Sequence, residues 1–263
     1  MNIKKHIPNA ITCCNLLCGC LAIVQSFEGN LVYAAYLVGL AAVFDFFDGF
    51  AARLLRVASP IGKDLDSLAD MVTFGVVPGF VMYKLLQMTL LIEIADGTTV
   101  DGWIISPPLS ADPIAIEYKK MILPEFIIYL AFLIPIFSAI RLAKFNNDVR
   151  QSDSFIGVPT PANAIFICSI PLILEYSNIK FVLNPYVLII ITIVFSLLLV
   201  SEIPLFALKF RNFSWRGNRI RYSFLALSLI LLITLQFVGI SLVILLYILM
   251  SVITNFYLKR RVA

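Results

Sequence analysis

Charged residues are scarce in this sequence. Only 14% of its 263 residues are charged, whereas 60% are hydrophobic, and the mean hydropathy is +0.95. A soluble domain has about 25% charged and about 45–50% apolar residues, and the interior of so short a chain could not bury this apolar surplus. No polar stretch between Ile11 and Tyr257 is long enough to form a separate soluble unit. We therefore predict one integral membrane domain over residues 1–263.

The cysteines lack the paired spacing of a zinc site. Four of the five, Cys13, Cys14, Cys18 and Cys20, crowd one apolar segment and form no CxxC pair. A membrane-embedded segment also offers no extracellular context for a disulfide framework. We expect these residues to be small helix-packing side chains, a role that free cysteine fills. The single histidine, His6, follows two lysines, which favours a position at the membrane surface over catalysis.

Hydropathy divides the chain into predicted membrane spans. A helix needs about 20 apolar residues to cross the ~30 Å hydrocarbon core. The last apolar run is too long for one crossing, and Gly239 is its expected hairpin point. The predicted spans are Ala10–Phe27, Leu31–Leu55, Asp66–Ile92, Phe126–Leu142, Ala162–Tyr176, Val187–Leu208, Tyr222–Val238 and Ile240–Tyr257. The sequence thus predicts an all-α, polytopic membrane helix bundle with about eight transmembrane helices.

Basic residues set the expected orientation, because Lys and Arg accumulate in short cytoplasmic loops. With a cytoplasmic N-terminus, 16 of the 20 basic residues fall on the inner side, all except Lys84, Lys119, Lys120 and Lys180. We therefore expect both termini in the cytoplasm of a multi-pass protein of a cell membrane, of the bacterial inner-membrane type. The net charge of +4 gives no indication of nucleic acid as a partner. Membrane lipids are the expected partners of one basic cluster, Arg211, Arg216, Arg219 and Arg221.

Four aspartates occur where membrane helices normally avoid charge. Asp45 and Asp48 are spaced i, i+3 in the second predicted span, and Asp66 and Asp70 are spaced i, i+4 in the third. Each pair therefore shares one helix face, and the short connection makes the two helices an antiparallel pair. Intramembrane carboxylates are costly and usually functional. Their mutual repulsion calls for cations, and all-oxygen ligation favours Mg²⁺, Mn²⁺ or Ca²⁺.

Glycine and arginine beside these aspartates indicate a phosphate-bearing ligand. Gly49 follows Asp48, and Gly62 precedes Asp66 by four residues; glycine lets a ligand approach the backbone closely. Arg53 lies one turn beyond Gly49, where a guanidinium can hold a phosphate through two hydrogen bonds. The combination predicts phosphoryl transfer. The alternative is that the acids only pair at the interface with Arg53, Arg56 and Lys63.

The full pattern resembles a known signature. Asp45-x-x-Asp48-Gly49-x-x-Ala52-Arg53, eight residues, then Gly62-x-x-x-Asp66-x-x-x-Asp70 is similar to the signature of the CDP-alcohol phosphotransferases, integral membrane enzymes of phospholipid synthesis. The segments Asp66–Gly79, Arg141–Asn146 and Phe155–Pro161 resemble the phosphatidylserine synthase branch of that family. The resemblance covers about Pro8–Pro161, with the signature at residues 45–70, and we expect helices after about residue 205 to be peripheral to the catalytic core.

The resemblance implies roles for individual residues. Two divalent cations, Mg²⁺ or Mn²⁺, would be bound by Asp45, Asp48, Asp66 and Asp70. Asp70 would also be the catalytic residue that accepts the proton of the attacking alcohol. CDP-diacylglycerol would be bound by Gly49, Arg53, Ser59, Gly62, Asn9, Thr12 and Asn15.

The implied reaction transfers the phosphatidyl group of CDP-diacylglycerol to the hydroxyl of L-serine, giving phosphatidylserine and CMP. Serine binding requires a cation for its carboxylate, and Arg141 and Lys144 at the inner end of the fourth span are the candidates, with positive-inside anchoring as the alternative interpretation. Another acceptor, such as glycerol phosphate or inositol phosphate, stays open, as does a homodimer. An ion-coupled transporter is the more distant alternative, because the acids cluster at one membrane face instead of in paired broken helices.

Overall fold

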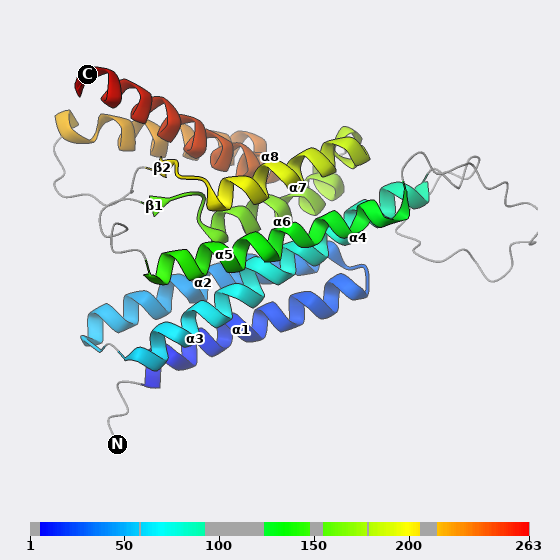
Figure 1. The fold of residues 1–263 in the computed structure, drawn as a ribbon, viewed down its shortest axis with the longest axis horizontal. Helices are drawn as coiled ribbons and strands as arrows, with labels where there is room; N and C mark the ends of the chain where they lie inside the picture. The colour runs from blue at the N-terminus through cyan, green and yellow to red at the C-terminus, as the bar shows by residue number, and fades with distance from the viewer. Residues whose placement is uncertain are drawn as a thin grey trace, which may run out of the picture.

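The computed structural model describes residues 6–57, 59–92, 124–147, 155–177, 179–205 and 215–262. These residues form a bundle of α-helices with one small two-stranded sheet, here called the β-clip (Figure 1). The helices are α1 (His6–Phe27), α2 (Leu31–Leu55), α3 (Pro60–Asp70), α4 (Val77–Ile92), α5 (Leu133–Asn147), α6 (Thr160–Ser177), α7 (Pro185–Val200) and α8 (Trp215–Val262). The strands are β1 (Phe155–Ile156) and β2 (Pro204–Leu205). A π-helical segment, Met71–Val76, joins α3 to α4, and 3₁₀ turns at Glu125–Phe132 and Lys180–Leu183 precede α5 and α7.

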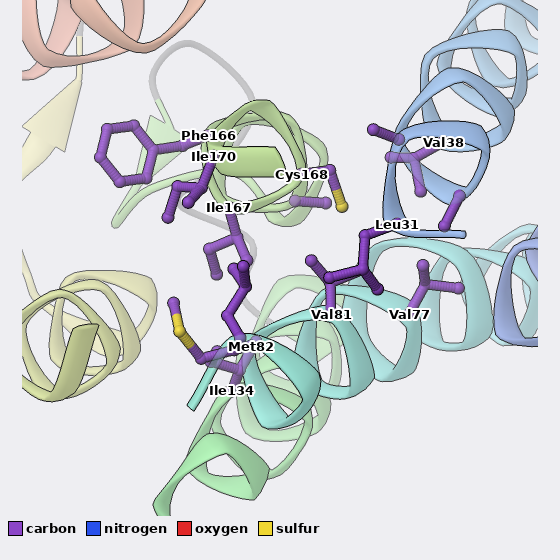
Figure 2. Packing of buried hydrophobic residues seen from close by; sticks show 14 of the residues in the cluster. Leu31, Val38, Val77, Val81, Met82, Ile134, Phe166, Ile167, Cys168 and Ile170 are labelled. Carbon is purple, nitrogen blue, oxygen red and sulfur yellow. The ribbon is translucent and has the colours of Figure 1, made fainter. Parts of the chain in front are cut away.

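The core of the bundle lies where α2, α4, α5 and α6 meet. Figure 2 shows apolar side chains from these four helices converging, among them Leu31, Met82, Ile134 and Ile167, none of which is more than 1% exposed. Small residues on α1 and α2 allow those two helices to pack closely, as is usual in membrane bundles. The buried small residues are Ala22, Ala34, Ala35 and Ala41.

The cysteines divide into two groups. Cys18 and Cys168 are buried in the core, as expected for packing residues. The prediction was wrong for Cys13, Cys14 and Cys20, which are exposed on α1. Their side chains lie on the outward face of the helix, and hydropathy alone does not distinguish this face from the buried one.

The number of long apolar helices is smaller than predicted. Five helices of the described residues are long and apolar enough to cross a membrane, not eight: His6–Phe27, Leu31–Leu55, Pro60–Thr89, Phe126–Asn147 and Asn218–Asn255. The predicted span Val187–Leu208 corresponds to the shorter apolar helix Pro185–Val200, because the chain leaves the helix before Pro204 of β2. The predicted span Ala162–Tyr176 lies within α6, which is largely buried and contains Pro171. Several apolar helices still indicate a multi-pass membrane protein.

The last long helix, α8, folds back on itself. Gln236 inside it has non-helical dihedrals, φ 46° and ψ −115°, and the rings of Phe224 and Tyr247 approach to 5.7 Å between centroids. Figure 1 shows the two arms, in orange and red, side by side. The predicted hairpin is therefore present, with its turn at Gln236 and not at Gly239. Gly239 instead packs against the backbone of Leu231 on the first arm, where a Cβ would collide.

The helix bundle begins and ends at the same side. In Figure 1 the start of α1 and the end of α8 lie at the left, together with the connection between α2 and α3 and the end of α5. The predicted placement of both termini on one side agrees with this arrangement, whereas their cytoplasmic location stays a prediction. The outer positions predicted for Lys119 and Lys120, and Arg211 of the basic cluster, lie outside the described residues.

The β-clip pairs the segment that precedes α6 with the segment that follows α7. Phe155 pairs with Leu205 and Ile156 with Pro204 in antiparallel register, and the Gly157 N–H donates to the Ile203 carbonyl at 3.0 Å. Gly157 has φ +75°, and a Cβ there would lie 2.5 Å from the Leu199 carbonyl oxygen. Only glycine fits this left-handed conformation without strain.

We expect Gly157→Ala to destabilise the protein, because the new Cβ meets both an unfavourable φ and the Leu199 carbonyl. The loss of unfolding free energy should be about 1–3 kcal/mol, measured by thermal unfolding in detergent. Gly39→Ala is the matched control, since a Cβ at Gly39 of α2 meets nothing within 4 Å. It should be neutral or slightly stabilising. Equal melting temperatures for the two variants would contradict the requirement for glycine at position 157.

Candidate active site

The four predicted aspartates come together where α1, α2 and α3 meet. Asp45, Asp48 and Asp66 each offer a carboxylate oxygen, and these oxygens all lie within 4.8 Å of one another. Asp70 lies one turn beyond Asp66 at the end of α3, close enough to the other three aspartates to interact with them electrostatically. Two helices therefore bring four carboxyl groups to one spot.

Local chain chemistry explains the sharp connection between α2 and α3. Arg56 closes α2 with a left-handed φ of 50°, and its N–H bonds back to the carbonyls of Ala52 and Arg53. Ser59 begins α3 as its N-cap, and its Oγ accepts from the Gly62 N–H at 3.0 Å. Pro60 follows at the first helical position, where its missing N–H costs nothing. A serine cap followed by proline is a strong helix start.

A cavity of about 280 Å³ opens beside the aspartates. Seven of the residues predicted for metal or nucleotide binding line it, Asn9, Thr12, Asp48, Gly49, Ser59, Gly62 and Asp66, together with Pro8, Ala52, Val57 and Lys63. A Cβ at Gly62 would lie 3.0 Å from Ser59 Oγ and 3.1 Å from Asn9 Oδ1. The Arg53 guanidinium lies 3.6 Å from the Cβ position of Gly49. Glycine at position 62 therefore avoids crowding Ser59 and Asn9, whereas a Cβ at Gly49 would make only ordinary van der Waals contact with Arg53.

Helix α1 supports the aspartates from the other side. The Thr12 hydroxyl donates to Asp48 Oδ2 at 2.7 Å, and Asn15 Nδ2 donates to Asp70 Oδ1 at 3.4 Å. Both side chains are buried. Within the described part of the chain, Asn15 Oδ1 has no hydrogen-bond partner. The three residues of α1 predicted to bind the nucleotide therefore have different surroundings. Thr12 and Asn15 donate hydrogen bonds to aspartates, whereas Asn9 lines the cavity.

The basic residues near the signature do not pair with the carboxylates in the part of the chain that the structure describes. Among the described residues, none of the four forms an ion pair with Arg53, Arg56 or Lys63; Lys63 Nζ instead donates to the Asn146 carbonyl at 3.2 Å. The alternative of simple interfacial ion pairing therefore does not describe this cluster. A set of clustered carboxylate oxygens fits a hard divalent cation, which prefers oxygen ligands, and Asp45, Asp48 and Asp66 could hold one.

Arg141 and Lys144, the predicted serine-binding pair, differ in environment. Arg141 is only 7% exposed, and its Nη1 donates to Thr160 Oγ1 of α6 at 3.3 Å. Its guanidinium also interacts electrostatically with Asp70 and lies 5.6 Å from the Phe145 ring centroid. Lys144 is exposed. An anchoring cation would place its charge in the polar interface, which the exposure of Lys144 favours and the burial of Arg141 disfavours, and serine binding by either residue stays a prediction.

Sequence reasoning missed two groups of residues at this site. Lys63 lines the cavity, and its position directly after Gly62 was an available signal for a cation near a bound anion. Asn146 Nδ2 donates to Ser67 Oγ at 2.9 Å, which joins α5 to α3. Thr160 Oγ1 accepts a hydrogen bond from Arg141 Nη1, which joins α6 to α5. The resemblance to the synthase branch included the segments that contain Asn146 and Thr160, but it gave no signal for these two contacts, because each depends on how distant helices pack.

Comparison with known proteins identifies relatives of this chain. The family model described as CDP-alcohol phosphatidyltransferase matches residues 5–198. A CDP-diacylglycerol–serine O-phosphatidyltransferase of Bacillus subtilis is 32% identical over 199 residues, covering 76% of this chain and 89% of that protein. A protein of the same name from Helicobacter pylori is 30% identical over 162 residues, covering 61% of this chain and 54% of its own length. An archaetidylserine synthase of Methanothermobacter thermautotrophicus is 28% identical over 187 residues, covering 68% of this chain and 66% of that protein.

Thr12→Val should weaken cation binding, because it removes the hydroxyl that orients Asp48 while preserving the shape of the side chain. Partners behind metal ligands typically contribute 10- to 100-fold in affinity, so we expect roughly that loss. The measurement is the rise in melting temperature with added Mg²⁺ or Mn²⁺, which reports binding without turnover. Thr12→Ser should retain the response. An unchanged titration in Thr12→Val would show that the hydroxyl has no such role.

Proposed function

Because this chain belongs to the CDP-alcohol phosphatidyltransferase family, we propose that it transfers the phosphatidyl group of CDP-diacylglycerol to the hydroxyl of L-serine. The products are phosphatidylserine and CMP. The observation that carries the proposal is the convergence of the carboxylates of α2 and α3 beside a cavity lined by Gly49 and Gly62. The serine acceptor is supported by relatives named CDP-diacylglycerol–serine O-phosphatidyltransferase in Bacillus subtilis and Helicobacter pylori, and by one named archaetidylserine synthase in Methanothermobacter thermautotrophicus.

The family uses a divalent metal, and the carboxylate cluster suits one. We propose two cations, Mg²⁺ or Mn²⁺, held by Asp45, Asp48, Asp66 and Asp70. Such ions would supply positive charge to neutralise the pyrophosphate and the leaving CMP oxygen. Thr12 and Asn15 keep the carboxylates of Asp48 and Asp70 oriented.

The other residues bind the nucleotide and move the proton. Arg53 holds a phosphate across the open face of Gly49, while Ser59, Gly62 and Asn9 bound the space for the cytidine half. The serine hydroxyl oxygen attacks the phosphorus that carries the lipid, and the bond from that phosphorus to the CMP oxygen breaks. Asp70 accepts the hydroxyl proton at a carboxylate oxygen as the new bond forms. Chemistry of this kind depends mainly on positioning and charge stabilisation.

We propose that the end of the bundle with the aspartates faces the cytoplasm. The start of α1, the end of α8 and the connection between α2 and α3 share that end (Figure 1), where most basic residues are expected. The lipid tails would stay in the bilayer while serine and CMP exchange with the cytosol. We also propose that α8 is peripheral to catalysis, because the family match ends at residue 198.

The decisive experiment incubates purified protein with CDP-diacylglycerol and labelled serine, with and without EDTA. We expect labelled phosphatidylserine and an equal amount of CMP, both lost with EDTA and restored by Mg²⁺ or Mn²⁺. CMP release with glycerol phosphate or inositol phosphate, but not with serine, would assign a different acceptor. Serine uptake into vesicles without CDP-diacylglycerol would instead support transport.

Asp45→Asn, Asp48→Asn and Asp66→Asn should each abolish turnover, because losing one charge from a shared cation site weakens every ion bound there. Asp64→Asn is the matched control, since Asp64 is exposed on the same helix as Asp66 and should retain wild-type activity. CMP release at saturating Mg²⁺ and Mn²⁺ is the measurement. Near-normal rates in any of the three site variants would contradict the metal assignment.

Arg141→Gln should raise the KM for serine much more than that for CDP-diacylglycerol. An apolar environment disfavours the serine carboxylate unless a cation meets it. A hydrogen bond to a charged group contributes about 1.5–3 kcal/mol, so the rise should be roughly ten- to a hundredfold. Arg53→Gln should have the opposite effect and raise the KM for CDP-diacylglycerol more than the KM for serine. If serine kinetics are intact in Arg141→Gln, the carboxylate binds elsewhere.

A further inference from the structure

A buried polar layer lies beside Arg141, between α5 and α6. Ser138, Thr160 and Asn163 are fully buried, and Arg141 is nearly so. In the part of the chain that the structure describes, several polar atoms of this layer have no hydrogen-bond partner: Ser138 Oγ, Arg141 Nε, Asn163 Nδ2 and Asn163 Oδ1. Buried polar groups in native proteins are almost always hydrogen-bonded. An amide with both ends unpartnered therefore requires a ligand or a water molecule.

The layer is continuous with the candidate active site. The contact between Arg141 Nη1 and Thr160 Oγ1, at 3.3 Å, joins α5 to the first turn of α6. Asn163 follows Thr160 by three residues and Ser138 precedes Arg141 by three, so each lies one turn from that contact on the same helix face. A Cβ at Gly75 would lie 3.1 Å from that of Ser138. The π-helical segment that contains Gly75 starts directly after Asp70.

The unpartnered atoms match the headgroup of an amino acid. Arg141 offers guanidinium donors for a carboxylate, and the Asn163 amide offers both an acceptor and donors. A carboxylate with an adjacent ammonium group can satisfy both side chains at once. Three other buried side chains have unpartnered atoms in the described residues. Ser196 of α7 and Ser228 of α8 offer only a hydroxyl, and the Asn15 amide nitrogen already donates to Asp70, so none of them presents a free amide as Asn163 does.

We propose that Asn163 is a specificity-determining residue that binds the α-ammonium group of the acceptor while Arg141 binds its carboxylate. The proposal rests on the proposed serine acceptor and adds to it a residue outside the aspartate signature. It explains how an enzyme of this kind could reject hydroxy acids that share the carboxylate and hydroxyl of serine. A site built around a hydrogen-bonding group disfavours the analogue that lacks it, because its own buried polar atoms are left unpaired.

The test removes one functional group from the acceptor and one from the protein. L-serine is compared with 3-hydroxypropanoate, which lacks the amino group, as substrate or as competitive inhibitor. In Asn163→Ala, kcat/KM for serine should fall roughly ten- to a hundredfold, with binding of 3-hydroxypropanoate unchanged. Arg141→Gln should show the complementary pattern. It should lower kcat/KM for serine and leave the binding of ethanolamine, which lacks the carboxylate, unchanged.

Two further variants separate recognition from folding. Asn163→Leu keeps the branching of the side chain at Cγ without the amide and should reproduce the selectivity of Asn163→Ala, and the melting temperatures of both variants show that the loss for serine does not follow from unfolding. Ser196→Ala removes a buried hydroxyl of α7 that has no partner among the described residues, and it should leave both kcat/KM for serine and the binding of 3-hydroxypropanoate unchanged. Equal losses for serine and 3-hydroxypropanoate, or no loss for either, would overturn the role of Asn163 while leaving serine as the acceptor. Wild-type CMP release with another alcohol but not with serine would overturn both proposals.

Discussion

Mutual repulsion of carboxylates in an apolar setting is the constraint around which this bundle is arranged. Asp45, Asp48 and Asp66 place oxygens within 4.8 Å of one another without a basic partner among the described residues. Such a cluster is costly unless its charge is neutralised, as the proposed cations would do, and unless each carboxylate is held in place. The Ser59 cap, the Thr12 hydroxyl and the Asn15 amide provide that support. The aspartates therefore depend on α1 as much as on the helices that carry them.

The close packing of α1 against the π-helical segment makes this support possible. A Cβ at Gly19 would collide with Thr73, so glycine allows the two backbones to approach. The Thr73 hydroxyl then donates to the Asn15 carbonyl at 3.3 Å, which fixes the residue whose side chain reaches Asp70. π-helical turns are uncommon and often occur at functional sites. Here the segment begins at the residue after Asp70, so a shift in its register would move that carboxylate.

The sequence was sufficient for features that depend on local spacing. The separations of Asp45 from Asp48 and of Asp66 from Asp70, with a short connection between them, predicted four carboxyl groups at one spot. Hydropathy was less informative about helix ends, because it does not register that Pro204 belongs to a strand or that α8 turns at Gln236. Neither spacing nor hydropathy could separate Arg141 from Lys144, since the burial of Arg141 depends on the packing of α5 against α6.

The proposed reaction needs two substrates to meet at one carboxylate, and the helix arrangement offers a side for each. Helices α1, α2 and α3 surround the cavity proposed for the nucleotide, whereas α5 and α6 supply Arg141, Thr160 and Asn163. Asp70 accepts a hydrogen bond from Asn15 of α1 and interacts electrostatically with Arg141 of α5. Because the two sides use separate helices, acceptor preference can change through α5 and α6 while the aspartate cluster stays intact. The signature alone therefore identifies the chemistry of the family, and in the proposed assignment the residues around Arg141 select the acceptor.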